Sequence, residues 1–270
     1  MIPVLNPNSA VAQTSTNTAE AFHSENLLKT IGGDFLYVFS SPLRLTTSGG
    51  LRLVTFTAAT AGLVSFVDDP FDEEYAREND HSFLYPFKRL AEVGKIYDDI
   101  SPVYFTVGVS GAAVVGGLAL KKEKLVTTGR LVLESAVMTQ ILTGTAKGVF
   151  GRSRPRTDRG AKQFDFFKFS KNEDFKSMPS GHVSSIFSTV TVLTKQYDEW
   201  WVKIPAYTFA VAVAFQRMNS RNHWFSDTVV GGTLGYGVGS TLMNRYSRQS
   251  SHSSFTPYLQ KNRLGVIMKF

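Results

Sequence analysis

The stretch that decides the fold is Pro179-Ser180-Gly181-His182, where a polar loop gives way to the apolar segment 183–194. Ser180 is a residue type that caps helix N-termini, and Gly181 lets another backbone approach closely. A helix that begins here directs several free N–H groups and its positive dipole end at one point, which suits a phosphate or a similar anion. His182 adds an imidazole that can transfer a proton near neutral pH. Taken alone, the four residues are also typical of an ordinary helix cap.

Two other motifs change this interpretation. Upstream, Lys147 is followed after six residues by an Arg-Pro pair that begins at Arg154. Downstream, Arg217 is followed after five residues by His223, and His223 after three residues by Asp227. At a spacing of four, His223 and Asp227 lie on one face of a helix. We expect the carboxylate to accept the Nδ1 proton of His223 and to leave Nε2 bare, as a nucleophile.

The order of the segments predicts that the motifs converge. Lys147 ends one apolar segment and His182 begins the next, while Arg217 ends the following segment and His223 precedes the last. If successive helices run antiparallel, these four residues lie at the same end of a bundle. The three motifs are therefore expected to form one site.

The residue types at this site suit phosphoryl transfer. Lys147, Arg154 and Arg217 supply three cations, and the arginine forks match phosphate oxygens in pairs. His182 can protonate a departing oxygen. Phosphoryl transfer requires mainly positioning and charge stabilisation, which these groups offer without a metal. No metal-ligand spacing and no nucleotide-type glycine-rich loop is visible, so we predict no metal and no cofactor.

Together, and in this order, the three motifs resemble those of the type 2 phosphatidic acid phosphatase superfamily, which also contains bacterial acid phosphatases and vanadium haloperoxidases. The resemblance covers roughly residues 140 to 235. It implies that His223 forms a phosphohistidine, that Asp227 supports His223, and that His182 protonates the leaving group. The phosphate-binding residues that it implies are Lys147, Arg154, Ser180, Gly181 and Arg217.

One residue departs from the family pattern. The third motif usually begins with Ser-Arg, whereas here Gln216 precedes Arg217. A literal Ser-Arg pair follows at Ser220 and Arg221, but Arg221 is only two residues from His223, so we reject that register. The missing serine puts a secondary hydrogen bond in doubt. Arg152, Arg156 and Arg159 flank the first motif and are interpreted as loop charges.

Three functions are compatible with these residues. The first is a metal-independent phosphatase that acts on a phosphorylated lipid or a small phosphate ester, including a diphosphate. The second is a vanadate-dependent haloperoxidase, although those enzymes are usually much longer. The third is a basic module without activity that binds anionic lipid or nucleic acid through the loop 147–176. That loop has no recognised nucleic-acid motif, so we predict no nucleic-acid partner.

Composition sets wider limits. The chain has 270 residues, of which 43% are hydrophobic, and a net charge of +7, which suits an anionic substrate or membrane surface. Cysteine is absent, which excludes disulfides and thiol chemistry.

Several apolar segments without strand alternation predict an all-α fold, a helical bundle of about six core helices. Glycines at 231, 235 and 239 predict a smooth face where a second helix packs closely. Alternating apolar residues after 263 suggest a short C-terminal β-hairpin with 255–260.

The predicted organisation has three parts. Residues 1–25 form a flexible segment, in which Ala10-Val11-Ala12 is either a signal-peptide remnant or chance. Residues 26–245 form the helical phosphatase domain, and residues 246–270 form a tail.

The uncharged run 100–120 is long enough to cross a bilayer, which needs ~20 residues, but its glycines also suit close helix packing. Mean hydropathy is −0.07, low for six spans. We favour a membrane-associated protein of the cell envelope, in the inner membrane or periplasm, over a compact soluble enzyme; the oligomeric state is open.

Overall fold

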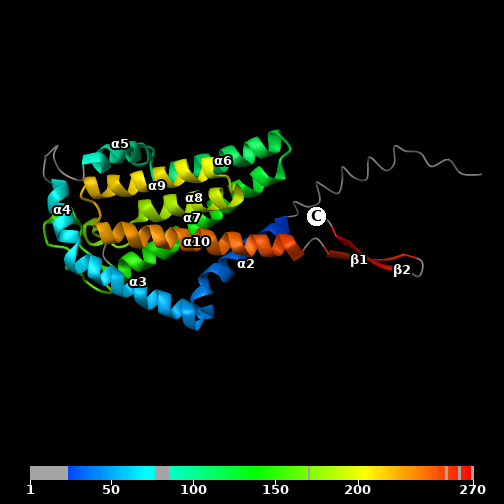
Figure 1. Ribbon diagram of the computed structural model, residues 1–270, viewed down its shortest axis with the longest axis horizontal. Coiled ribbons are helices and arrows are strands. Elements are labelled where there is room, and N and C mark those ends of the chain that lie inside the picture. The colour runs from blue at the N-terminus through cyan, green and yellow to red at the C-terminus, as the bar shows by residue number, and fades with distance from the viewer. Residues whose placement is uncertain (1–23, 77–84, 170, 253–254, 261–262, 269–270) are drawn as a thin grey trace, which may run out of the picture.

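The computed structural model describes residues 24–76, 85–169, 171–252, 255–260 and 263–268, and in this part of the chain it forms a helical bundle (Figure 1). The predicted all-α class is confirmed. The helices are α2 (Ser24–Phe39), α3 (Thr47–Phe66), α4 (Asp68–Ala76), α5 (Tyr85–Ile100), α6 (Pro102–Ala119), α7 (Glu123–Phe150), α8 (Gly181–Gln196), α9 (Trp200–Asn219) and α10 (Phe225–His252). Short 3₁₀ helices are η1 (Ser41–Arg44), η2 (Pro155–Thr157) and η3 (Glu173–Phe175).

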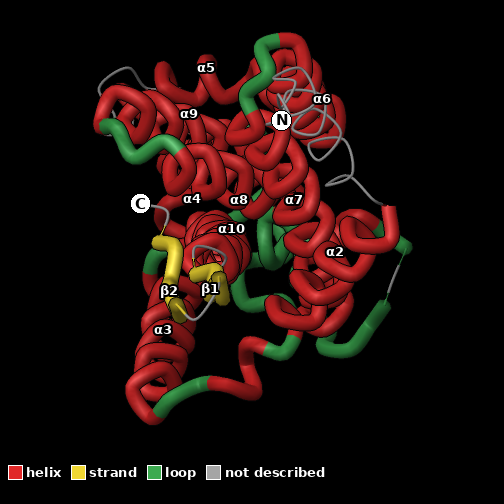
Figure 2. Tube along the Cα trace, turned by 90° about the vertical axis from the view of Figure 1, so that its right-hand side faces the viewer, coloured by secondary structure: helices red, strands yellow, loops and turns green. Residues whose placement is uncertain are grey.

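Helix α8 is the centre of the bundle, and it packs against α7, α9 and α10 (Figure 2). The predicted glycine face of α10 lies against it. A Cβ atom on Gly235 would come within 2.1 Å of the Ser184 carbonyl oxygen, and one on Gly231 within 2.6 Å of the Ser180 carbonyl oxygen. Any side chain at these positions would push α10 away from α8, so the glycines are needed for this contact. The close packing predicted for this face is confirmed.

The outer helices also pack closely on the bundle, through glycine contacts and a buried hydrogen bond. Helix α5 packs on α9, where a Cβ atom on Gly94 would meet the Ala212 carbonyl oxygen at 2.2 Å. Helix α6 packs on α7, and Ser110 Oγ donates a 2.7 Å hydrogen bond to the Gly129 carbonyl oxygen. Helix α2 contacts α10 at the far end of the bundle. This arrangement leaves α5 and α6 beside the N-terminal end of α8.

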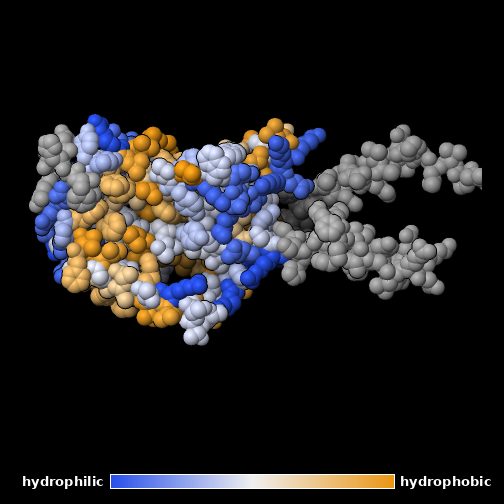
Figure 3. Space-filling model, viewed as in Figure 1, coloured by the Kyte–Doolittle hydropathy of each residue, from blue (hydrophilic) through white to orange (hydrophobic). Residues whose placement is uncertain are grey.

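Among the described residues, two helices, α3 and α6, are long and apolar enough to cross a membrane. The apolar window of α6 is 17% buried, and that of α3 has no buried residue. Large apolar side chains on α3 therefore face outward, among them Leu51, Val54 and Phe66. Figure 3 shows hydrophobic residues, in orange, gathered on the face around α3. Packing within the described chain does not account for this surface, which is unusual for a soluble monomer.

The last two elements lie beyond the bundle. Helix α10 continues to His252, seven residues past residue 245, where the helical domain was predicted to end. Strands β1 (Phe255–Gln260) and β2 (Arg263–Met268) then pair antiparallel, and Phe255 lies opposite Met268. The predicted hairpin is present. Residues 1–23, which carry the predicted signal-peptide remnant, lie outside the described residues.

Candidate active site

The predicted site residues lie at one end of the bundle, on the left in Figure 1. Lys147 is in the last turn of α7, and Ser180 is the N-cap of α8. Arg217 is in the last turn of α9, and Asp227 is in the first turn of α10, just after His223. Gly181 and His182 are the first residues of α8, while Arg154 lies in the loop between α7 and α8. The antiparallel order of the helices therefore brings the three motifs together.

The path of the loop depends on the glycine that follows α7. Gly151 caps the helix with a φ of 53°, a left-handed conformation. A Cβ atom there would also lie 2.0 Å from the Asp165 carbonyl oxygen. No other residue fits both conditions, so Gly151 fixes the direction in which Arg152 and Arg154 leave the helix.

Three polar atoms around the site are buried, and the described residues offer them no hydrogen-bond partner. They are Ser180 Oγ, Arg154 Nε and Arg217 Nε. Ser180 occupies the N-cap position, but its side chain makes no capping bond. Buried donors without partners are rare and costly, because they have lost their water. These atoms therefore indicate a site shaped for a ligand with acceptor oxygens.

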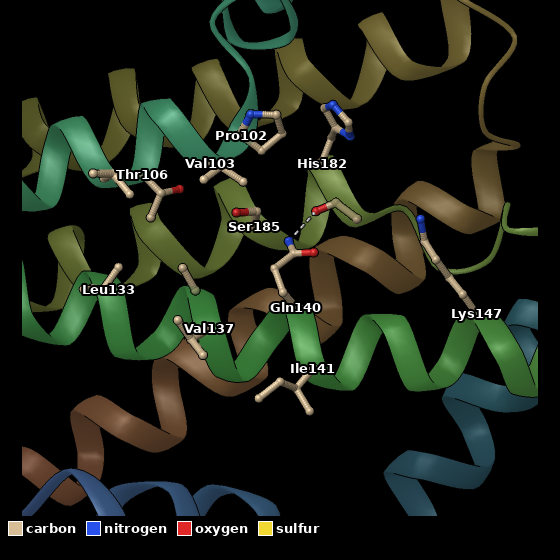
Figure 4. Close-up of a pocket in the computed structure, with 13 residues that line it drawn as sticks. Pro102, Val103, Thr106, Leu133, Val137, Gln140, Ile141, Lys147, His182 and Ser185 are labelled. Carbon is tan, nitrogen blue, oxygen red and sulfur yellow. Dashed lines mark hydrogen bonds between the residues drawn. The ribbon is translucent and has the colours of Figure 1, made fainter. Parts of the chain in front are cut away.

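Lys147 adds a positive charge to this cluster. Burial and the neighbouring Arg154 lower the pKa of Lys147 to about 8, so the amine still carries a proton at neutral pH. Its Nζ lies 3.5 Å from the position that a Cβ atom on Gly181 would take. The Gly181 carbonyl oxygen accepts a 3.2 Å hydrogen bond from Gln140 Nε2, shown dashed in Figure 4. The lysine amine therefore lies beside the first turn of α8.

His223 is almost fully buried and is held by one strong contact. Its Nδ1 lies 2.7 Å from the Ser177 carbonyl oxygen, which can only accept, so Nδ1 carries the proton. Nε2 is then unprotonated and available. Burial lowers the pKa of His223 to about 3, with Lys147 and Arg217 acting in the same direction and Asp227 against them. The imidazole is therefore neutral over the physiological pH range.

Asp227 does not hold Nδ1 of His223 as the spacing suggested. Its Oδ2 is 3.8 Å from Nδ1, which is too far for a hydrogen bond. The carboxylate instead accepts hydrogen bonds from Arg152 Nη1 at 2.6 Å, Ser177 Oγ at 2.5 Å and the Trp224 amide at 3.0 Å. Burial alone would raise the pKa of Asp227, but Arg152, His223 and the Ser177 hydroxyl lower it to about 2. Asp227 thus remains an anion close to the imidazole, and Ser177 connects the two groups.

Arg152 is the most important residue that the sequence interpretation missed. It was expected to be a loop charge, yet its side chain is completely buried. The guanidinium joins Asp227 to Asp68, with an Nη2–Oδ2 distance of 2.7 Å to the latter, and also donates to the Ala161 carbonyl oxygen. Asp68 begins α4 and accepts from Ser226 as well. Only the closeness of Arg152 to Arg154 in the sequence hinted at this role.

A second missed residue, Asp98 of α5, closes the other side of the site. Its Oδ1 lies 3.0 Å from His182 Nε2 and 2.5 Å from Arg217 Nη1, while Oδ2 accepts a 3.0 Å hydrogen bond from Gln216 Nε2. Burial lowers the pKa of His182 to about 4, with help from Arg217, while Asp98 opposes this shift. The carboxylate therefore contacts two of the groups predicted to act on a phosphate.

The other arginines have separate partners. Arg156 pairs with Asp174 at 2.9 Å. Arg221 contacts the carboxylates of Asp72 at 2.6 Å and Asp158 at 2.8 Å, and so faces away from the cluster of unpaired donors. This contact agrees with the choice of Arg217 as the arginine of the third motif.

A cavity of about 650 Å³ opens beside the site, between α6, α7 and α8 (Figure 4). Lys147, Gly181 and His182 border one end of it. Its remaining lining is mostly apolar, and comes from Pro102, Val103, Thr106, Val107, Leu133, Ala136, Val137, Gln140, Ile141 and Ser185. A polar end with cations thus continues into an apolar groove.

Comparison with known proteins shows a similarity to one superfamily. The sequence model of the PAP2 superfamily matches residues 129–251, a range that contains every predicted site residue, and the resemblance to that superfamily is confirmed. No curated protein matches the chain significantly. A crystal structure of Aquifex aeolicus LpxE is similar, with 17% identity and a TM-score of 0.45, over 66% of this chain and 95% of that one. The family match supports a phosphatase that acts on a phosphate ester.

Proposed function

We propose that this protein is a metal-independent phosphatase that hydrolyses a lipid phosphate through a phosphohistidine on His223. The observation that carries the proposal is the set of buried, unpaired donors on Ser180, Arg154 and Arg217, next to a histidine whose Nδ1 is protonated. These donors match the oxygens of a phosphoryl group. Among the described residues, no group of three or more His, Asp or Glu could hold a metal ion. The positive charge that stabilises the transition state would then come from side chains.

In the first half of the reaction, Nε2 of His223 attacks phosphorus and the bond to the ester oxygen breaks. The negative charge of the bound phosphate raises the pKa of His182 from the value of about 4 that burial and the nearby cations give it, so the imidazole binds a proton. His182 then gives this proton to the ester oxygen, which leaves as an alcohol. The Ser177 carbonyl keeps the proton on Nδ1 during attack, so the phosphorylated imidazole becomes a cation. The anionic carboxylate of Asp227, 3.8 Å away, stabilises that cation.

In the second half, water attacks the phosphorus of the phosphohistidine. His182, now neutral, removes a proton from the water, and the P–N bond breaks as the electron pair returns to Nε2 of His223. Inorganic phosphate leaves, and both histidines regain their starting states. Lys147, Arg154 and Arg217 carry the negative charge throughout, and the start of α8 adds its free N–H groups.

The apolar cavity supports a lipid over a small soluble ester. Five of the apolar side chains that line the cavity are between 43% and 64% exposed, so the groove is open along the side of the bundle. They are Val103, Val107, Leu133, Val137 and Ile141. A hydrocarbon chain would bury these side chains while its phosphate reaches Lys147. The outward-facing apolar residues of α3 and α6 support a membrane location, which we assign to the cell envelope.

The proposal is tested with the purified protein on one lipid phosphate and one soluble aryl phosphate. We expect hydrolysis of both, with the higher kcat/KM for the lipid, inhibition by vanadate, and no inhibition by EDTA. Rapid acid-free quenching with labelled substrate should trap a phosphoenzyme in the wild type and none in the His223→Ala variant. Complete loss of activity on chelation, restored by a divalent ion, would show that the mechanism is wrong.

A further inference from the structure

The loop that follows the site exposes three phenylalanines. Phe166, Phe167 and Phe169 are 60%, 71% and 70% exposed. Their backbone is nevertheless well held, because the Phe167 amide donates a 2.8 Å hydrogen bond to the Val149 carbonyl oxygen. Phe167 also has a φ of 58°, which is rare and unfavourable for a bulky residue. The chain thus maintains a strained backbone with its aromatic rings directed outward.

This aromatic loop continues an apolar stripe on α7. Leu133, Val137 and Ile141 follow one another at intervals of four residues, and each is partly exposed on the same face of the helix. Further along that face, the ring of Phe169 packs directly on Gly148, where a Cβ atom would lie 2.2 Å away. The exposed apolar surface therefore runs along α7, beside the apolar helix α6, and ends at the loop.

Basic residues gather where this apolar surface ends. Between residues 162 and 171 the chain has three lysines, at 162, 168 and 171, and one acidic residue, Asp165, which gives a local net charge of +2. All three lysines are exposed. Aromatic rings followed by lysines are the combination found where proteins meet the headgroup region of a bilayer.

We propose that residues 164–169 are an interfacial anchor, which inserts its phenylalanine rings at the headgroup boundary of an anionic lipid bilayer. The lysines around it would contact anionic headgroups. Because Phe169 rests on α7 one residue from Lys147, the anchor would set the depth of the active-site end relative to the lipid surface. The inference concerns a surface and does not depend on the proposed phosphatase activity.

The absence of cysteine permits a direct test, since each introduced cysteine is the only thiol in the chain. Phe167→Cys would carry a nitroxide spin label in the full chain, reconstituted in vesicles of zwitterionic lipid with an anionic phosphatidylglycerol fraction. The matched control is Asp158→Cys, because Asp158 has a similar exposure of 73% and a similar φ of 53° but lies outside the aromatic loop.

We expect the label at 167 to collide more with dissolved oxygen and less with a water-soluble nickel complex than the label at 158. Its depth should decrease when the anionic lipid is omitted. Equal, water-like collision rates at both positions would overturn the proposal. A label at 167 that is shielded from both reagents would also overturn it, because the loop would then contact protein rather than lipid.

Discussion

Replacing Asp98 by asparagine provides the most informative test of the site. The Asp98 carboxylate contacts both His182 and Arg217, two groups that the proposed mechanism assigns to the substrate. A bound phosphate brings its own negative charge and must compete with this carboxylate. Asp98→Asn keeps the shape of the side chain and removes the charge. The variant should therefore bind anions more tightly and, at the same time, hold a less basic His182.

The size of the first effect follows from the contact with Arg217. A hydrogen bond between charged groups contributes about 1.5–3 kcal/mol. The Asp98 side chain is 30% exposed, so water screens part of this interaction and the lower end applies. A gain of about 1.4 kcal/mol on removing the competitor corresponds to about tenfold tighter binding of vanadate.

The second effect concerns proton transfer. Asp98 raises the pKa of His182 against burial and Arg217, and a nearby opposite charge typically changes a pKa by about one unit or more. Without the carboxylate the pKa of His182 falls, and a smaller fraction of His182 carries a proton at a given pH. The descending alkaline limb of kcat should therefore move about one unit to lower pH. The shift should be seen with an alkyl phosphate, whose leaving oxygen needs that proton.

The assay compares the vanadate inhibition constant and the pH profile of kcat between the wild type and the Asp98→Asn variant. Asp72→Asn is the control, because Asp72 forms a comparable ion pair with Arg221 outside the cluster of unpaired donors. That control should leave both quantities unchanged. If Asp98→Asn weakens vanadate binding and leaves the pH profile unchanged, the role of Asp98 is to hold α5 against α9. The Asp98 carboxylate then does not compete with a bound anion for Arg217 and His182.

Three further substitutions address the remaining groups. Arg217→Ala should lower kcat/KM far more than Arg221→Ala, because of these two arginines Arg217 is the one with a buried donor that the described residues leave unpaired; similar losses would refute the chosen register. His182→Ala should reduce kcat/KM strongly for an alkyl phosphate and weakly for an aryl phosphate, whose leaving group needs no acid; equal losses would make His182 a phosphate-binding residue. Arg152→Met should lower the free energy of unfolding by about 3–5 kcal/mol, measured as a fall in Tm, because two buried carboxylates lose their counter-charge. An unchanged Tm would contradict that role.

The convergence of the three motifs could be predicted from the sequence because it depends on local patterns. Each motif residue lies where an apolar segment begins or ends, and antiparallel helices bring alternate ends together. The glycine face of α10 was predictable for a similar reason, since a spacing of four residues marks one side of a helix. The bare Nε2 of His223 was also expected, although its cause differs. The Ser177 carbonyl, 46 positions away in the sequence, holds Nδ1 where the neighbouring Asp227 was expected to do so.

The supporting charges could not be predicted, because their partners are distant along the chain. Arg152 pairs with Asp68 across 84 positions and with Asp227 across 75, and Asp98 pairs with Arg217 across 119. Most arginines and aspartates in a sequence face water, and nothing local distinguishes the few that are buried in pairs. The family match begins at residue 129, so neither Asp68 nor Asp98 falls within it. Only the packing of α4 and α5 against the site reveals them.

Gln216, the one residue of the third motif that departs from the family pattern, donates to Asp98. A serine hydroxyl sits directly on Cβ and would be too short to reach the same oxygen from the same backbone position. We therefore expect Gln216→Ser to loosen Asp98 and to tighten vanadate binding, in the direction of Asp98→Asn but by less. If both residues act through one carboxylate, the double variant should bind vanadate no more tightly than Asp98→Asn alone. Additive effects of the two substitutions would show that Gln216 affects the site by a route that does not involve Asp98.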